Sequence, residues 1–165
     1  MSQPPGGSRL VVVGVCGRRV VLVLLAVSAA QVGVWAVLAP RSFFAGFPGG
    51  GHRWVVGDGP FNGHLVRDVG AFYLALLVLT LGAVRRPEPQ LVRVTGLVWL
   101  VFSVPHLAYH AGHLGGLGGV DRLLELVALS VTVLLAALLC LPVRTRVPLG
   151  MSQPPGRRRP TSTGS

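Results

Sequence analysis

The chain has 165 residues, of which 51% are hydrophobic and only 12% are charged, and its mean hydropathy is +0.64. Soluble domains carry about 25% charged residues, so this composition excludes an ordinary soluble protein and places the chain among membrane proteins. The net charge is +10 and all fifteen basic residues are arginine; because most of them flank apolar runs, where they orient membrane spans, we expect no nucleic-acid partner.

Four apolar segments predict four membrane-spanning helices. A span needs roughly 20 residues, and the second and third segments reach that length only if the polar residues at their ends are helical as well. The predicted spans are residues 20–39, 64–84, 92–113 and 122–143. They form an all-α, transmembrane four-helix bundle. The polar flanks, residues 1–17 and 144–165, are expected to be disordered cytoplasmic tails, the second one basic.

The first span also has features of a cleaved signal peptide. Arg18 and Arg19 precede its apolar core, and small residues precede Gln31. The apolar run nevertheless continues well past that point to Ala39, which favours an uncleaved helix. Cleavage would leave three spans.

Arginine placement predicts the orientation of the bundle. Eleven arginines lie before the first span, between the second and third spans, or after the fourth; those on the other side are Arg41, Arg53, Arg67 and Arg122. Arginine-rich flanks stay in the cytoplasm, so we expect a cell-membrane protein with both termini cytoplasmic. The long loop between the first two spans then lies outside, with one short helix after Pro40.

All five histidines fall in the outer half of this arrangement. His106, His110 and His113 share one helical face about 60° wide, at depths of about 20, 25 and 30 Å from the inner boundary. Ionisable residues inside a membrane usually face the bundle interior or a wet cavity and mark function. We therefore predict a functional polar cluster, which consists of Asn62, His64, Arg67, Asp68, His106, His110 and Glu125.

Local patterns suggest roles for single residues near this cluster. Asn62 is expected to cap the N-terminus of the second span, and Asp121 that of the fourth. Gly70 allows a close approach between helices. His106 is the deepest of the three histidines and needs a buried polar partner, for which we expect Asp68 or Glu125.

A metal site is the sharper interpretation of the three histidines. Residues at i and i+4 on a helix can share one metal ion, so His106, His110 and His113 are candidate metal ligands, with Asp68 or Glu125 as a carboxylate ligand. Bis-histidine haem would require His64 to face the third span. The simpler alternative is that the histidines form hydrogen bonds and close the outer end of the bundle. No cofactor is favoured.

Enzyme motifs are missing from the sequence, which has no GxSxG, phosphate-binding loop or dinucleotide fingerprint. We therefore expect a multi-pass membrane protein that is not an enzyme. Its polar cluster would interact with a protein partner, a lipid or an ion, and the partners expected are membrane lipids, a second copy of the chain or another membrane protein. The alternative function is a membrane redox or metal-handling protein that binds metal or haem through the third-span histidines.

Three stretches carry a resemblance to a known group of proteins: "APRSFFAGFPG", "GPFNGHLVRDVGAFYLAL" and "HLAYHAGHL". Because these stretches occur in this order, the chain resembles an uncharacterised family of small four-span membrane proteins from high-GC Gram-positive bacteria. The resemblance covers most of the chain outside its tails and implies the four-span fold, but no activity. It also implies an acidic residue where this chain has Gly63, so a mechanism that uses that carboxylate is not expected here.

Overall fold

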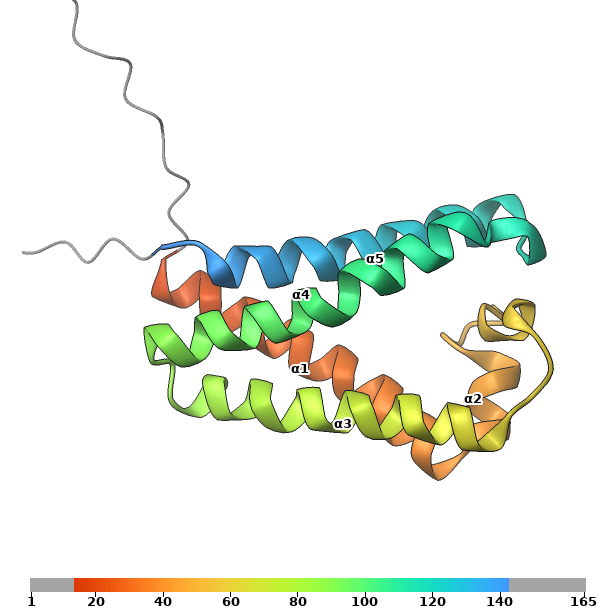
Figure 1. The fold of residues 1–165 in the computed structure, drawn as a ribbon, viewed down its shortest axis with the longest axis horizontal. Helices are drawn as coiled ribbons and strands as arrows, with labels where there is room; N and C mark the ends of the chain where they lie inside the picture. Colours follow the sequence, from red (N-terminus) through yellow and green to blue (C-terminus); the bar gives the residue numbers. More distant parts are fainter. Residues whose placement is uncertain (1–13, 143–165) are drawn as a thin grey trace, which may run out of the picture.

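The computed structural model describes residues 14–142, and all the regular secondary structure in that range is helical, without strands (Figure 1). The elements are α1 (Val15–Leu38), α2 (Pro40–Gly46), the 3-10 helix η1 (Val55–Asp58), α3 (Gly63–Arg85), α4 (Pro89–Gly112), the 3-10 helix η2 (Leu114–Gly116) and α5 (Gly119–Cys140). Four of them, α1, α3, α4 and α5, are long and apolar enough to cross a membrane. The predicted all-α, four-helix fold is confirmed, and the chain is a multi-pass membrane protein.

The helix boundaries differ from the predicted spans by a few residues. α1 begins at Val15 rather than at residue 20, so the helix includes Arg18 and Arg19, and residues 15–17 do not belong to a tail. α4 begins at Pro89 and α5 at Gly119, each earlier than predicted. Proline suits the first turn of a helix because its missing N–H would have no intrahelical partner there. The rest of the predicted tails, residues 1–13 and 143–165, lies outside the described residues.

The four long helices form two antiparallel hairpins. α1 packs along α3, and α4 packs along α5. A short turn at residues 86–88 joins the hairpins at one end of the bundle, where α1 also begins and α5 ends (Figure 1). We call this the turn end. The opposite end, which carries α2, η1 and η2, is the loop end, and the hairpins diverge toward it (Figure 1).

Each hairpin has a glycine at the point where its helices come closest. A Cβ atom added at Gly70 of α3 would lie 2.9 Å from the Cβ of Ala36 in α1. A Cβ atom added at Gly96 of α4 would lie 2.8 Å from the carbonyl oxygen of Ala136 in α5. Small residues allow such close backbone contact, which drives the packing of membrane helices. The expected role of Gly70 is therefore confirmed, and Gly96 has the same role in the second hairpin.

A buried hydrogen bond connects the two hairpins. Trp99 of α4 is fully buried, and its Nε1 donates to Thr80 Oγ1 of α3 at 2.9 Å. The Thr80 hydroxyl in turn donates to the Leu76 carbonyl oxygen at 2.7 Å. The ring of Trp99 also packs edge-on against Tyr73. These contacts hold α3 against α4 on the turn-end side of the region where the hairpins separate.

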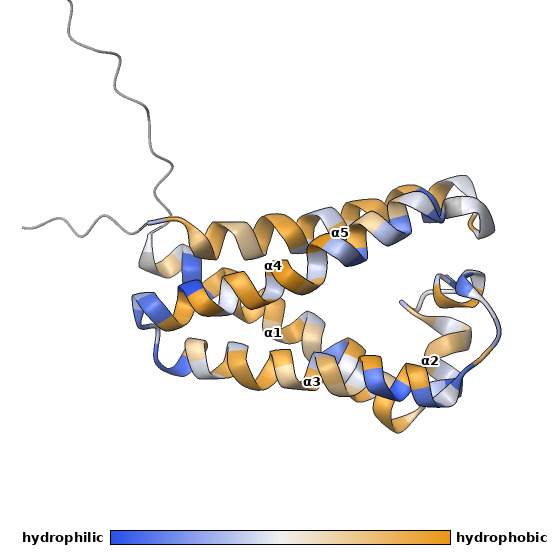
Figure 2. Cartoon of the chain, in the orientation of Figure 1, coloured by the Kyte–Doolittle hydropathy of each residue, from blue (hydrophilic) through white to orange (hydrophobic). Residues whose placement is uncertain are grey.

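The outward faces of the long helices are apolar, as a lipid environment requires. Val101 and Val78 are 77% and 72% exposed, and Leu134 is 62% exposed. In Figure 2 the middle of each span is mostly hydrophobic, and hydrophilic colour gathers at the α3–α4 turn and toward the loop end. Lipid tails solvate such side chains as well as a protein core does, so the exposed faces are the membrane-contacting surface.

The hydrogen bond between Trp99 and Thr80 leads to a test with a matched control. Thr80→Val removes the only acceptor of a buried indole N–H, which costs about 1–3 kcal/mol in the free energy of unfolding. Thr95 is equally buried, but its hydroxyl donates only to Leu91 of its own helix. We expect Thr80→Val to lower the thermal unfolding midpoint of the detergent-solubilised chain more than Thr95→Val. Equal midpoints would show that the inter-hairpin bond contributes nothing.

Candidate functional site

A cavity of about 430 Å³ lies between the hairpins at the loop end. All four spans contribute to its walls, together with residues between 43 and 62 of the connection between α1 and α3. We call that connection, residues 39–62, the loop segment. The cavity exists because the hairpins are held together near Trp99 and separate beyond it, and the loop segment folds back over the resulting space.

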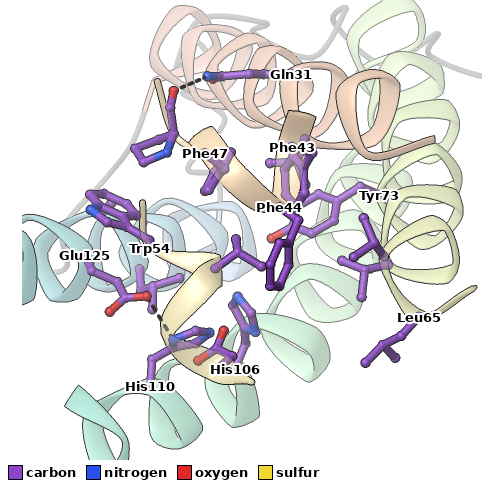
Figure 3. Close-up of a pocket in the computed structure, with 18 of the residues that line it drawn as sticks. Gln31, Phe43, Phe44, Phe47, Trp54, Leu65, Tyr73, His106, His110 and Glu125 are labelled. Atoms are coloured by element: carbon purple, nitrogen blue, oxygen red, sulfur yellow. Dashed lines mark hydrogen bonds and ion pairs between the residues drawn. The ribbon is translucent and has the colours of Figure 1, made fainter. Parts of the chain in front are cut away.

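Aromatic side chains form much of the cavity wall (Figure 3). The set consists of Phe43, Phe44, Phe47, Trp54, Tyr73 and Trp99. α2 positions three of them, because Pro40 starts this short helix directly after α1 and the i, i+4 spacing places Phe43 and Phe47 on one side, with ring centroids 4.8 Å apart. The expected short helix after Pro40 is thus present and supplies the aromatic wall.

The polar part of the wall comes from α4 and α5. His110 Nδ1 lies 2.9 Å from Glu125 Oε1, and the two side chains are only 13% and 5% exposed (Figure 3). His106 lies one helical turn away on the same face of α4, with its ring edge-on to that of His110 at 4.6 Å. The His106 ring also stacks on that of Phe102. A buried carboxylate and two imidazoles therefore meet at one side of an otherwise apolar cavity.

The loop segment is fastened to the second hairpin through Asp121. His52 Nδ1 lies 2.5 Å from Asp121 Oδ1, and Trp54 Nε1 donates to the same oxygen at 3.2 Å. Nearby, a Cβ atom added at Gly116 would lie 3.2 Å from the Cα of Gly57, so η1 and η2 touch through their backbones. We call the three side chains at this point, His52, Trp54 and Asp121, the clasp.

The expected capping role of Asp121 is wrong. Gly118 is the N-cap residue of α5, and Asp121 lies in the first turn. A carboxylate is favourable there because it interacts with the positive end of the helix dipole. The Asp121 side chain binds His52 and Trp54 because the loop segment crosses from the first hairpin to α5.

The expected N-cap at Asn62 is confirmed. Its side-chain oxygen accepts hydrogen bonds from the backbone N–H groups of His64 and Leu65, both at 3.1 Å. Asn62 also lines the cavity, at the point where the loop segment enters α3. The cap therefore fixes the boundary between the aromatic wall and the third long helix.

The structure divides the predicted polar cluster into two parts. On α3, His64 pairs with Asp68 at 3.3 Å, but these side chains are 87% and 58% exposed, and Arg67 donates to the carbonyl of Gly63 in its own helix. None of these three residues lines the cavity. The other part is the buried set on α4 and α5, which consists of His106, His110 and Glu125.

The expected partner of His106 is also wrong. Glu125 pairs with His110, and Asp68 pairs with His64. His106 makes ring contacts with Phe102 and His110. The rotation of α4 against α5 decides this assignment, because it brings His110 opposite Glu125 and leaves His106 one turn deeper.

The three proposed metal ligands, two on α4 and one at its C-cap, do not converge. His113 stacks on Tyr109 and its Nδ1 lies 2.7 Å from the Tyr109 carbonyl oxygen, so its ring is held on its own helix. Within residues 14–142 no three His, Cys, Asp or Glu side chains lie close enough to hold a metal ion. The structure therefore brings His106 and His110 together and leaves His113 apart. His64, the proposed haem partner, is on the exposed part of α3.

Sequence reasoning did not find Asp58 or the clasp. Asp58 belongs to η1 and lines the cavity. Its signal in the sequence is that it is the one acidic residue in the aromatic-rich loop segment. The pairing of His52 and Trp54 with Asp121 joins residues 67 or more positions apart, and no local pattern encodes it.

No known protein family, curated protein or solved structure shows significant similarity to the chain. The chemistry of the cavity must therefore be argued from its own residues.

The His110–Glu125 pair leads to a stability test in which the neighbouring histidine is the control. His110→Ala leaves the buried carboxylate of Glu125 without its hydrogen-bond partner, which costs about 1–3 kcal/mol in the free energy of unfolding, and more if the group is charged. His106→Ala removes ring contacts but no contact with a carboxylate. We expect His110→Ala to lower the thermal unfolding midpoint in detergent markedly more than His106→Ala. A larger loss for His106→Ala would mean that the pair does not stabilise the bundle.

Proposed function

We propose that this multi-pass membrane protein is a non-enzymatic binding protein, and that it takes a small amphipathic molecule into the cavity between its hairpins. The proposal is based on one observation: a buried His–Glu pair lines a cavity whose wall is otherwise largely apolar and aromatic. Small-molecule sites typically have volumes of about 300–1,000 Å³ and combine apolar walls with a few convergent polar groups. The cavity matches both features, because its volume is about 430 Å³ and its apolar wall includes the His110–Glu125 pair.

The position of the His110–Glu125 pair supports binding rather than a purely structural role. Burying a carboxylate in a low-dielectric interior is costly even when it has a hydrogen-bond partner. Ionisable residues within membrane spans accordingly mark ligand or ion sites. His110 and Glu125 both line the cavity, so a ligand inside it can contact the pair directly.

The proposal includes a location and an orientation. The protein lies in the cell membrane with both termini in the cytoplasm and the cavity in the outer half of the bilayer. Arginine placement supports this orientation, because arginine-rich segments stay in the cytoplasm and the turn end carries Arg18, Arg19, Arg85, Arg86 and Arg93. We also propose that the chain belongs to the four-span family that its three motifs resemble, and that its partners are membrane lipids, a second copy or another membrane protein.

Cysteine labelling tests the orientation. In a variant that lacks Cys16 and Cys140, a single cysteine replaces either Arg53 in the loop segment or Arg86 in the α3–α4 turn, both of which are exposed. We expect a membrane-impermeant maleimide to modify Arg53→Cys in intact cells and Arg86→Cys only after lysis. The reverse pattern would contradict the proposed orientation.

Filling the cavity tests the binding function. Ala128 of α5 lines the cavity, whereas Ala75 of α3 is exposed and lies outside it. The probe is triphenylphosphine oxide, a neutral aromatic molecule, measured by calorimetry with the purified chain in non-ionic micelles and with empty micelles as the blank. We expect Ala128→Trp to weaken binding by about tenfold or more, and Ala75→Trp to leave it unchanged. An equal loss in both variants would count against a cavity site.

A further inference from the structure

We propose that the ligand of this cavity is a lipophilic organic cation, meaning a molecule with a protonated or quaternary nitrogen on an apolar body. This inference rests on the proposed binding function and specifies the chemical class that the cavity selects. It is based on one juxtaposition: carboxylates and aromatic rings line the same cavity, and no arginine within residues 14–142 contributes to its wall.

The charge of the cavity is opposite to that of the chain as a whole. The chain has fifteen basic and five acidic residues. Two of those acids, Asp58 and Glu125, line the cavity, and its other ionisable side chains are His106, His110 and Tyr73. The four arginines of the proposed outer side, at positions 41, 53, 67 and 122, are all absent from the lining. An anionic ligand would therefore meet two carboxylates and no arginine, whereas a cation would be attracted.

The contacts of the two carboxylates leave capacity for a ligand. Glu125 pairs through Oε1 with His110 Nδ1. A neutral imidazole donates one N–H and leaves the negative charge on the carboxylate, whose second oxygen can accept further hydrogen bonds. Asp58 forms no hydrogen bond or ion pair within the described part of the chain. The low-dielectric surroundings of the buried Glu125 carboxylate strengthen its attraction to a cation.

The aromatic wall favours the same class of ligand. A cation within about 6 Å of a ring centroid is attracted by the negative face of the ring, and aromatic cages recognise quaternary ammonium groups in this way. Rings of Phe43, Phe44, Phe47, Trp54 and Trp99 line the cavity. The chain already uses this interaction outside the cavity, where the Arg41 guanidinium lies 4.7 Å from the centre of the Phe61 ring.

The test uses two probes of the same shape and opposite charge. Tetraphenylphosphonium is a cation and tetraphenylborate is an anion, and triphenylphosphine oxide is the neutral reference. Each is titrated calorimetrically into the purified full-length chain in non-ionic micelles, with empty micelles subtracted. We expect tetraphenylphosphonium to bind about tenfold or more tightly than tetraphenylborate. Equal or tighter binding of tetraphenylborate would overturn the proposal.

Charge-neutralising variants locate the effect. Glu125→Gln and Asp58→Asn should each weaken tetraphenylphosphonium binding by about fivefold or more, and should weaken it more than they weaken binding of the neutral probe. The control is Asp68→Asn, because Asp68 is an exposed carboxylate outside the cavity. Asp58 is exposed on η1, so its variant keeps the test valid if Glu125→Gln disturbs folding. Cation binding that neither variant weakens would overturn the proposal.

The outcomes separate this inference from the function on which it rests. If the neutral probe binds and Ala128→Trp abolishes its binding, but the cation has no advantage, the cavity function stands and the cation specificity is wrong. If none of the three probes binds the wild-type chain above empty micelles, the binding function itself is wrong.

Discussion

The hydrocarbon core of a membrane offers no hydrogen-bond partner, so each polar group at that depth must find one within the protein or within a cavity. The long helices form their own backbone hydrogen bonds, and two of the buried polar groups in the spans are paired across helices. Trp99 uses Thr80, and Glu125 uses His110. These pairs occur where the hairpins touch or face the cavity, whereas the exposed large apolar side chains are mostly valine and leucine.

The cavity results from two contacts that act at different depths. Near the middle of the bundle, the bond between Trp99 and Thr80 holds α3 against α4. At the loop end, the clasp connects residues 39–62 to α5 without bringing α3 and α4 together. The space between these points is lined by side chains from both hairpins. A ligand site can therefore exist without any break in the long helices.

The sequence predicts the features that depend on local pattern. Long apolar runs predict the spans, Asn62 the start of α3, Pro40 a short helix, and Gly70 a close contact. The i, i+4 spacing also places His106 and His110 on one face. Partner choice depends instead on how helices rotate and cross, which local pattern does not encode. For that reason the partner expected for His106 was wrong, and the role of Asp121 emerged only with the returning loop segment.

The clasp has a consequence for biosynthesis. Asp121 belongs to the last helix, whereas His52 and Trp54 belong to the first hairpin. The first hairpin can enter the membrane and pack through Gly70 as soon as α3 is made, since its contacts are local. Its loop segment has no clasp partner until α5 has been inserted. Ribosome-bound chains that stop before residue 121 would thus hold a formed helical pair with an unfastened loop, and the cavity would be completed by the final span.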